Sequence, residues 1–146
     1  MPMARFLVRG NSMEPALEWG QRLLVSRVAY RIRGPKSGEL VIVRHPSRPQ
    51  LLLVKRVVGV PGDDVRLESG VLKVNDTTVA LASSALFEAH WHLDEGAYFV
   101  MGDRSDGSAD SRTFGPVNRS SLIGKVWLSY WPPHRWGLPR RSFVLR

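Results

Sequence analysis

The chain has 146 residues, of which 43% are hydrophobic and 23% are charged, and its 21 Lys and Arg against 13 Asp and Glu leave a net charge of +8. These values are typical of a single globular domain, so we expect one domain over residues 1–146 and exclude global disorder. The lack of cysteine excludes disulfides, thiolate metal sites and cysteine nucleophiles. The charge favours anionic partners, but the basic residues are scattered without interleaved aromatic residues, so we expect no nucleic acid partner.

Short apolar runs separated by turn residues dominate the first half of the chain. They predict strands at Arg5–Arg9, Arg22–Val28, Glu39–Arg44 and Leu51–Val60. The stretch Val65–Val74 predicts a hairpin, because Ser69-Gly70 separates two alternating runs. A further turn follows at Asn75-Asp76.

The second half continues the pattern with fewer strands. The residues predict a helix at Ala80–His92, a strand at Ala97–Met101, a polar loop at Gly102–Gly115, a helical turn capped by Asn118 and a strand at Lys125–Trp131. We expect residues 80–96 to form an insertion and residues 132–146 an irregular tail. Many short strands and little helix predict a mainly β fold of antiparallel sheets folded into a barrel.

Two residues suggest nucleophilic catalysis. Ser12 lies in a Ser-Met-x-Pro turn with no histidine or cysteine near it, and a serine needs a base to become a nucleophile. Strand alternation places Lys55 on one face with Leu53 and Val57, where burial would lower the lysine pKa and make the amine a usable base. The strand pattern alone favours the plainer interpretation, a lysine whose stem packs and whose amine reaches water.

Two other patterns are weaker. His90 and His92 would face the same side of a strand, but no third ligand has a useful spacing, so we expect no metal site and no cofactor. The loop Gly102–Gly115 is rich in short polar residues, which is common in solvated loops. Within it, Asp110 and Arg112 can pair, and Ser108 and Ser111 can form hydrogen bonds inward.

In order and spacing, three segments resemble the type I signal peptidases, a family of serine–lysine endopeptidases. "NSMEPAL" resembles the family's nucleophile box, "VKRVVGVPGD" its lysine box and "GDRSDGSADSRTFG" its third box. Any one box would be weak evidence, whereas three in order are strong. The resemblance covers Phe6 to about Tyr130 and implies the β fold of the signal peptidase catalytic core.

The resemblance also implies residue roles. Ser12 would be the nucleophile and, through its backbone N–H, an oxyanion donor. Lys55 would be the general base, oriented by Ser108, while Asp110 and Arg112 would support the loop. Shallow pockets for small substrate residues such as alanine would be lined by Val8, Met13, Leu17, Leu53 and Val54.

The sequence departs from the family pattern in three places. Gly10 stands where many members carry a hydroxyl residue that completes the oxyanion hole, so the second donor is in doubt. Arg104 and Ser105 replace the usual Asn-Arg of the third box. The family usually has membrane helices before the serine, whereas only 11 residues precede Ser12 and none forms a signal-peptide hydrophobic region.

The resemblance predicts cleavage of N-terminal signal peptides or pro-peptides from precursor proteins, with the substrate bound as an extended strand. The ending "LSYWPPHRWG" resembles proteases that mature nickel superoxide dismutase, so a dedicated maturation protease is the alternative enzyme. The alternative of another class is a non-catalytic basic β module that binds anionic surfaces. An anionic membrane surface is a candidate partner, and the localisation stays open between cytoplasmic and peripheral, although the family acts at the outer face of the cytoplasmic membrane.

Overall fold

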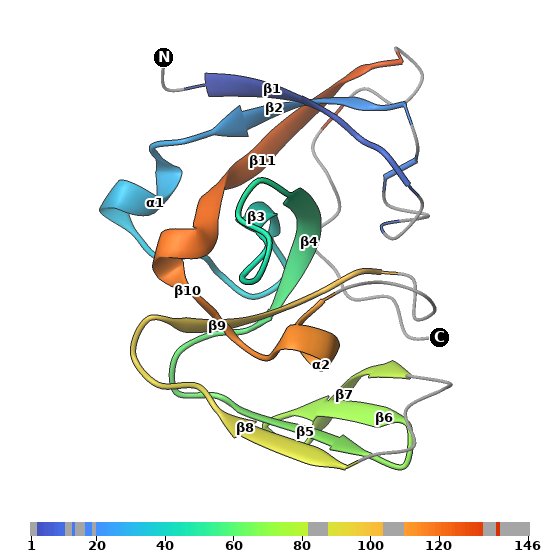
Figure 1. The fold of residues 1–146 in the computed structure, drawn as a ribbon, viewed down its shortest axis with the longest axis vertical. Coiled ribbons are helices and arrows are strands. Elements are labelled where there is room, and N and C mark those ends of the chain that lie inside the picture. Colours follow the sequence, from blue (N-terminus) through green and yellow to red (C-terminus); the bar gives the residue numbers. More distant parts are fainter. Residues whose placement is uncertain are drawn as a thin grey trace.

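The computed structural model describes residues 3–10, 13, 17–18, 20–81, 88–103, 110–132 and 137. These residues form two antiparallel sheets and very little helix, as the sequence predicted (Figure 1). The strands are β1 (Met3–Leu7), β2 (Arg22–Ser26), β3 (Leu40–Arg44), β4 (Leu52–Gly59), β5 (Asp64–Glu68), β6 (Val71–Val74), β7 (Thr77–Leu81), β8 (Ala89–His92), β9 (Ala97–Met101), β10 (Val117–Asn118) and β11 (Leu122–Trp131). The helical turns are α1 (Ala29–Ile32), α2 (Ser111–Phe114) and a 3-10 turn at Arg119–Ser121.

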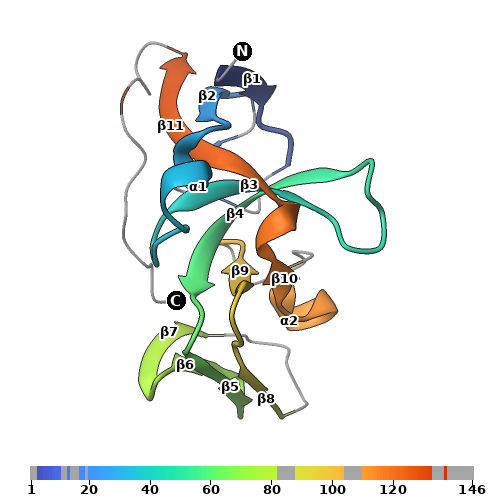
Figure 2. The ribbon, with the colours of Figure 1, turned by 90° about the vertical axis from the view of Figure 1, so that its left-hand side faces the viewer.

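The larger sheet has seven strands in the order β1-β2-β11-β3-β4-β9-β10. The strands β1 and β4 are not neighbours in this order, yet residues of both line one groove, so the sheet curls toward a half-barrel. The hairpin of β3 and β4 projects away from the rest of the molecule (Figure 2). This curl brings the start of β4 close to the chain that continues from β1.

The smaller sheet has four strands in the order β7-β6-β5-β8 and lies at the other end of the molecule (Figure 1). Its tight turns use positive φ angles at Ser69 and Gly70 and again at Asn75 and Asp76, which is the geometry of two-residue hairpin turns. The predicted hairpin over Val65–Val74 is therefore confirmed, with β5 beginning one residue earlier.

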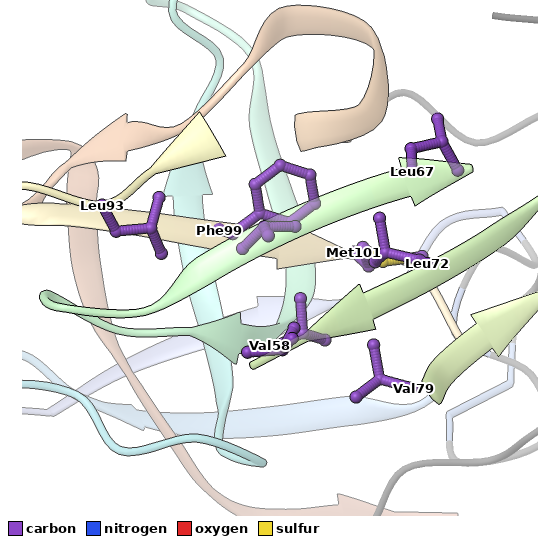
Figure 3. Close-up of a cluster of buried hydrophobic side chains, with 9 residues drawn as sticks. Val58, Leu67, Leu72, Val79, Leu93, Phe99 and Met101 are labelled. Atoms are coloured by element: carbon purple, nitrogen blue, oxygen red, sulfur yellow. The ribbon is translucent and has the colours of Figure 1, made fainter. Parts of the chain in front are cut away.

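Three buried clusters hold the two sheets. The first joins them, because Val58, Phe99 and Met101 of the larger sheet pack against Leu67 and Leu72 of the smaller one (Figure 3). The second fills the inside of the curl with Val8, Met13, Leu17, Leu23, Val25, Leu40, Ile42 and Val126. The third covers the opposite face of β3 and includes Val41, Val43, Val57 and Val100. Both faces of β3 and of the second half of β4 are thus buried, whereas the start of β4 is partly exposed.

The helix predicted at Ala80–His92 is wrong wherever the structure describes it. Ala80 and Leu81 belong to β7, and residues 89–92 form β8; residues 82–87 lie outside the described residues. Pairing with β6 and β5 outweighs the local helix preference of the alanine-rich sequence.

Smaller differences concern the ends of elements. The first strand begins at Met3 and not at Arg5, and α1 was not predicted. The turn after Asn118 is present, although the Asn118 side chain makes no capping hydrogen bond. Of the irregular tail predicted for 132–146, residues 133–136 and 138–146 lie outside the described residues. No helix in the described part of the chain is long and apolar enough to cross a bilayer.

Candidate active site

A groove of about 250 Å³ runs between β1 with its continuation and the start of β4. We call it the β1–β4 groove. It is lined by Phe6, Leu7, Val8, Arg9, Gly10, Met13, Ile42 and Leu51–Lys55. Val8 and Met13, at 4% and 2% exposure, form its buried floor together with Ile42. The lining is mostly aliphatic, so the groove suits an extended chain with small apolar side chains.

The sequence-predicted pocket residues mostly meet in this groove. Val8, Met13, Leu53 and Val54 line it, whereas Leu17 is buried in the cluster beneath and is not part of the lining. Gly10 also lines the groove and adopts a φ of 85°, a conformation that residues with a Cβ rarely adopt. The backbone here therefore explains a glycine where the resemblance suggested a hydroxyl residue.

Lys55 lies at one end of the groove with its side chain buried. It is 2% exposed, and Val41, its partner across the β3–β4 ladder, is fully buried. Burial lowers the pKa of the Lys55 amine to about 8, an effect opposed by the carboxylates of Asp110 and Asp103 and reinforced by the charge of Arg112. Lys55 is therefore buried, and the plainer interpretation of the strand pattern, an amine that reaches water, is not supported.

Asp110 lies at the start of α2 and acts electrostatically on Lys55. The carboxylate is fully buried and accepts hydrogen bonds from the Arg112 guanidinium, at 3.0 Å from Nε and 2.6 Å from Nη2. It also caps α2 by accepting from the Arg112 backbone N–H at 3.0 Å, and it accepts from the Gly102 N–H at 3.1 Å. The ion pair expected from the sequence is present, and it closes the loop between Gly102 and α2.

The inward hydrogen bond expected of Ser111 is present, whereas two further residues of this region, Arg56 and Asp103, were missed at the level of sequence. The Ser111 hydroxyl is buried and accepts from the Val100 N–H at 2.9 Å. Arg56 is 1% exposed and forms a bidentate pair with Asp103, with both N···O distances at 2.8 Å. The signal available in the sequence was the pair of adjacent cations, Lys55 and Arg56, on one apolar strand. If both are buried, Arg56 needs an anionic partner.

Two of the predicted site residues lie outside the described residues. These are Ser12, predicted as the nucleophile, and Ser108, predicted to orient the lysine. The third segment of the resemblance is described at its two ends, Gly102–Asp103 and Asp110–Gly115. The structure therefore brings together Lys55, Asp110 and Arg112 beside the groove, and the placement of the two serines stays a prediction.

His90 and His92 lie at a different place, on the outer side of the smaller sheet. Both rings approach the same Asp64 oxygen, at 3.2 Å and 3.0 Å. All three side chains are about half exposed. Among the described residues, no group of three or more histidine or carboxylate side chains has a geometry suited to a metal ion.

Replacing Asp110 with Asn should destabilise the fold without changing its shape. The buried Arg112 guanidinium, 10% exposed, loses its charged partner, and breaking one side of such a pair costs about 3 kcal/mol. For a domain of this size we expect a Tm lower by roughly 10 °C, measured by circular dichroism. The matched control is Asp76→Asn at an exposed turn, which should leave Tm unchanged; equal Tm values for both variants would contradict the anchoring role.

Comparison with known families agrees with this geometry. The family model for signal peptidase, peptidase S26, matches residues 1–131. The chain belongs to the signal peptidase family. The match spans both sheets, the β1–β4 groove and all three sequence segments of the resemblance.

Relatives within the signal peptidase family share about a third of their residues with this chain. A probable signal peptidase I-2 of Synechocystis is 32% identical over 140 residues, covering 90% of this chain and 64% of that protein. Signal peptidase I of Pseudomonas aeruginosa is 31% identical, covering 95% and 69%. A subunit of the mitochondrial inner membrane protease of Xenopus tropicalis is 30% identical, covering 91% and 72%. The chain thus spans about two thirds of the length of these relatives.

The signal peptidase fold is also seen in a solved structure. The crystal structure of a signal peptidase I from Enterococcus faecalis matches with a TM-score of 0.52 at 23% identity, covering 64% of this chain and 97% of that one. This likeness confirms the mainly β architecture of folded antiparallel sheets.

Proposed function

We propose that this signal peptidase family member is a serine endopeptidase that removes N-terminal signal peptides or pro-peptides from precursor proteins, with Ser12 as nucleophile and Lys55 as general base. The observation that carries the proposal is the buried Lys55 amine at the end of an apolar groove, with its pKa lowered to about 8. At pH 7 about a tenth of such amines are neutral, against about one in 3,000 for a lysine of ordinary pKa. A neutral amine can accept the proton of a serine hydroxyl.

The reaction then follows in two stages. The Ser12 Oγ attacks the carbonyl carbon of the scissile bond while its proton passes to the Lys55 Nζ, and the carbonyl electron pair moves onto oxygen. Collapse of this intermediate breaks the C–N bond, and the Lys55 ammonium gives its proton to the leaving amine. Water attacks the resulting acyl-serine with Lys55 again accepting the proton, which returns to Ser12 as the acid product leaves. The Ser12 backbone N–H donates to the oxyanion.

The surrounding residues serve this chemistry by position. Asp110 and Arg112 hold the end of the loop, and Ser108, carried by that loop, donates or accepts the hydrogen bond that orients the Lys55 amine. The carboxylates of Asp110 and Asp103 also limit how far burial lowers the pKa of Lys55. The amine thus stays basic enough to take a proton while remaining partly neutral near pH 7.

The substrate binds as an added strand in the β1–β4 groove. β1 is an edge strand of the larger sheet, and pairing of β4 with β9 begins only at Arg56. In the described part of the chain no strand pairs with Leu52–Lys55 on that side, so backbone groups of β4 face the groove. An extended peptide satisfies them through main-chain hydrogen bonds, and small side chains fit over Val8 and Met13.

The test is to incubate the protein with a panel of precursors and to map the cut sites by mass spectrometry. The panel contains secretory precursors and a nickel superoxide dismutase precursor, because the ending "LSYWPPHRWG" resembles the maturation proteases of the latter. Cleavage after small residues in several precursors supports the general peptidase, and cleavage of one precursor alone supports the dedicated protease. Salt-sensitive binding to anionic surfaces without cleavage of any precursor would instead support the non-catalytic module.

Weak binding to anionic membranes is a further prediction, made from the segment around Trp127 and Trp131. Both side chains are about half exposed on β11, and the Arg22 guanidinium lies 5.6 Å from the Trp131 ring centre. Tryptophan favours the membrane interface, and each nearby cation adds about 1 kcal/mol at an anionic surface. We expect co-sedimentation with phosphatidylserine vesicles at low salt that is lost at high salt.

The control for this prediction is a double variant, Trp127→Ser with Trp131→Ser, and vesicles of phosphatidylcholine alone. Binding should be weaker for the double variant with anionic vesicles, and for the wild-type protein with phosphatidylcholine vesicles. A wild-type protein that stays in the supernatant with anionic vesicles at low salt would contradict the prediction and favour an enzyme that works away from membranes.

A further inference from the structure

One exposed charged side chain, Arg9, lines the β1–β4 groove in addition to the buried Lys55. Among the described lining residues, Arg9 and Lys55 are the charged ones, and none is acidic. Arg9 is exposed, and no ion pair is found for it within the part of the chain that the structure describes. An anionic substrate group near Arg9 would therefore meet a cation that no described carboxylate neutralises.

The backbone on either side fixes where Arg9 stands. The Val8 N–H donates to the Gln21 carbonyl at 2.8 Å, and the Val8 carbonyl accepts from the Gly20 N–H at 2.9 Å. This pairing extends the β1–β2 ladder by one residue, so the side chains alternate as in a strand. Val8 points into the buried floor, whereas Leu7 and Arg9, both exposed, point outward.

Among the lining residues that the structure describes, the opposite bank of the groove carries no acidic side chain. It presents Leu51 and Leu52, which are 37% and 39% exposed. A peptide bound as a strand between the banks places alternate side chains on the floor and in the outward layer. The outward side chains then lie between aliphatic residues on one bank and Leu7 with Arg9 on the other.

We propose that Arg9 is a specificity-determining residue that favours an aspartate or glutamate at the outward-facing substrate positions, two and four residues before the cut. The proposal rests on the proposed function, which places the peptide in this groove as an extended strand. If the residue just before the cut lies on the floor, strand alternation puts the first and third positions inward and the second and fourth outward. The planar guanidinium donates two parallel hydrogen bonds to a carboxylate, and it repels a lysine or arginine at the same place. Arg9 then selects substrates by charge, in addition to the selection of small side chains by the floor of the groove.

The expected effect of substrate charge on kcat/KM is modest, because the contact with Arg9 is exposed to solvent. One exposed ion pair corresponds to about a fivefold change in kcat/KM, and the effect should weaken in 1 M salt. The kinetics use three peptides with alanine at the first and third positions before the cut and glutamate, glutamine or lysine at the second. Binding of the same peptides, labelled with a fluorophore, is measured in parallel by anisotropy on the Ser12→Ala protein.

The variant Arg9→Glu should reverse the order of preference, from glutamate over lysine to lysine over glutamate, in both cleavage and binding. The matched control is Arg5→Glu, which makes the same charge change at an exposed position of β1 outside the groove and should keep the wild-type order. A reversal in binding without cleavage of any peptide would support the role of Arg9 while overturning the proposed function. Equal kcat/KM values for the glutamate and lysine peptides would overturn the role of Arg9 alone, and no binding of any peptide would overturn both.

Discussion

Replacing Ser12 with Ala is expected to abolish peptide cleavage and to leave the fold unchanged. The substitution removes the only oxygen proposed to attack the substrate, and loss of the nucleophile in a Ser-based site typically costs about 10⁶-fold in kcat. No other group in the proposed mechanism forms the acyl intermediate. The rate is measured with a fluorogenic peptide, and the fold is checked by circular dichroism and by Tm.

The control for this variant is Ser47→Ala, a change of the same size at an exposed position in the loop between β3 and β4. It should retain wild-type activity. Cleavage by Ser12→Ala near the wild-type rate, in protein purified free of other proteases, would show that Ser12 is not the nucleophile.

Replacing Lys55 with Met should also abolish activity, but it should raise the stability of the protein. In the folded state burial lowers the pKa of the amine to about 8, against about 10.5 in the unfolded chain. Holding a protonated amine in this site therefore costs about 3 kcal/mol at pH 7. Methionine has a similar length and carries no charge, so the variant escapes this cost.

The sign of this stability difference can be checked through its dependence on pH. Below pH 8 both states of the wild-type protein hold the proton, and the whole cost is present. Between pH 8 and 10.5 the unfolded state binds more protons than the folded state, so wild-type stability rises with pH, and above 10.5 the cost is gone. Urea unfolding of Lys55→Met and wild type should thus differ most below pH 8 and converge at high pH.

The control here is Lys36→Met, because Lys36 is exposed and its hydrogen bonds with Glu39 are made by its backbone N–H and carbonyl. It should leave activity unchanged and change stability by less than about 0.5 kcal/mol. A Lys55→Met protein that is less stable than wild type at pH 7, or that cleaves peptides, would contradict the role of a costly buried base.

Much of the fold was predictable because local signals agreed with tertiary pairing. Ala97–Met101 is a short continuous apolar run bounded by glycines, and the structure forms β9 over the same residues. The hairpin around Ser69-Gly70 carries its own turn signal. The Ala80–His92 stretch failed for the opposite reason, because strand pairing with distant residues decided a segment whose alanines favour a helix.

The site was predictable in part. The resemblance implied a catalytic Lys55, whereas the strand pattern alone favoured an amine that reaches water, and the structure buries this residue. The short spacing of Asp110 and Arg112 pointed to their ion pair. The pair of Arg56 with Asp103 joins residues 47 positions apart, and the bond from Val100 to Ser111 depends on how α2 docks against β9. Such contacts follow from the packed sheet, and no local pattern contains them. Likewise, no sequence pattern indicated a role for Arg9, and only the structure places it among the lining residues of the groove.

The pH dependence of kcat/KM tests the Ser–Lys mechanism most directly, because this parameter reports the ionisation of the free enzyme. With a soluble peptide substrate, we expect kcat/KM to rise about tenfold from pH 6 to pH 7 and to level off above an apparent pKa of about 8, the value that burial gives Lys55. An apparent pKa near 6.5, the ordinary value of histidine, or a rate independent of pH from 6 to 9, would contradict a neutral Lys55 as the base.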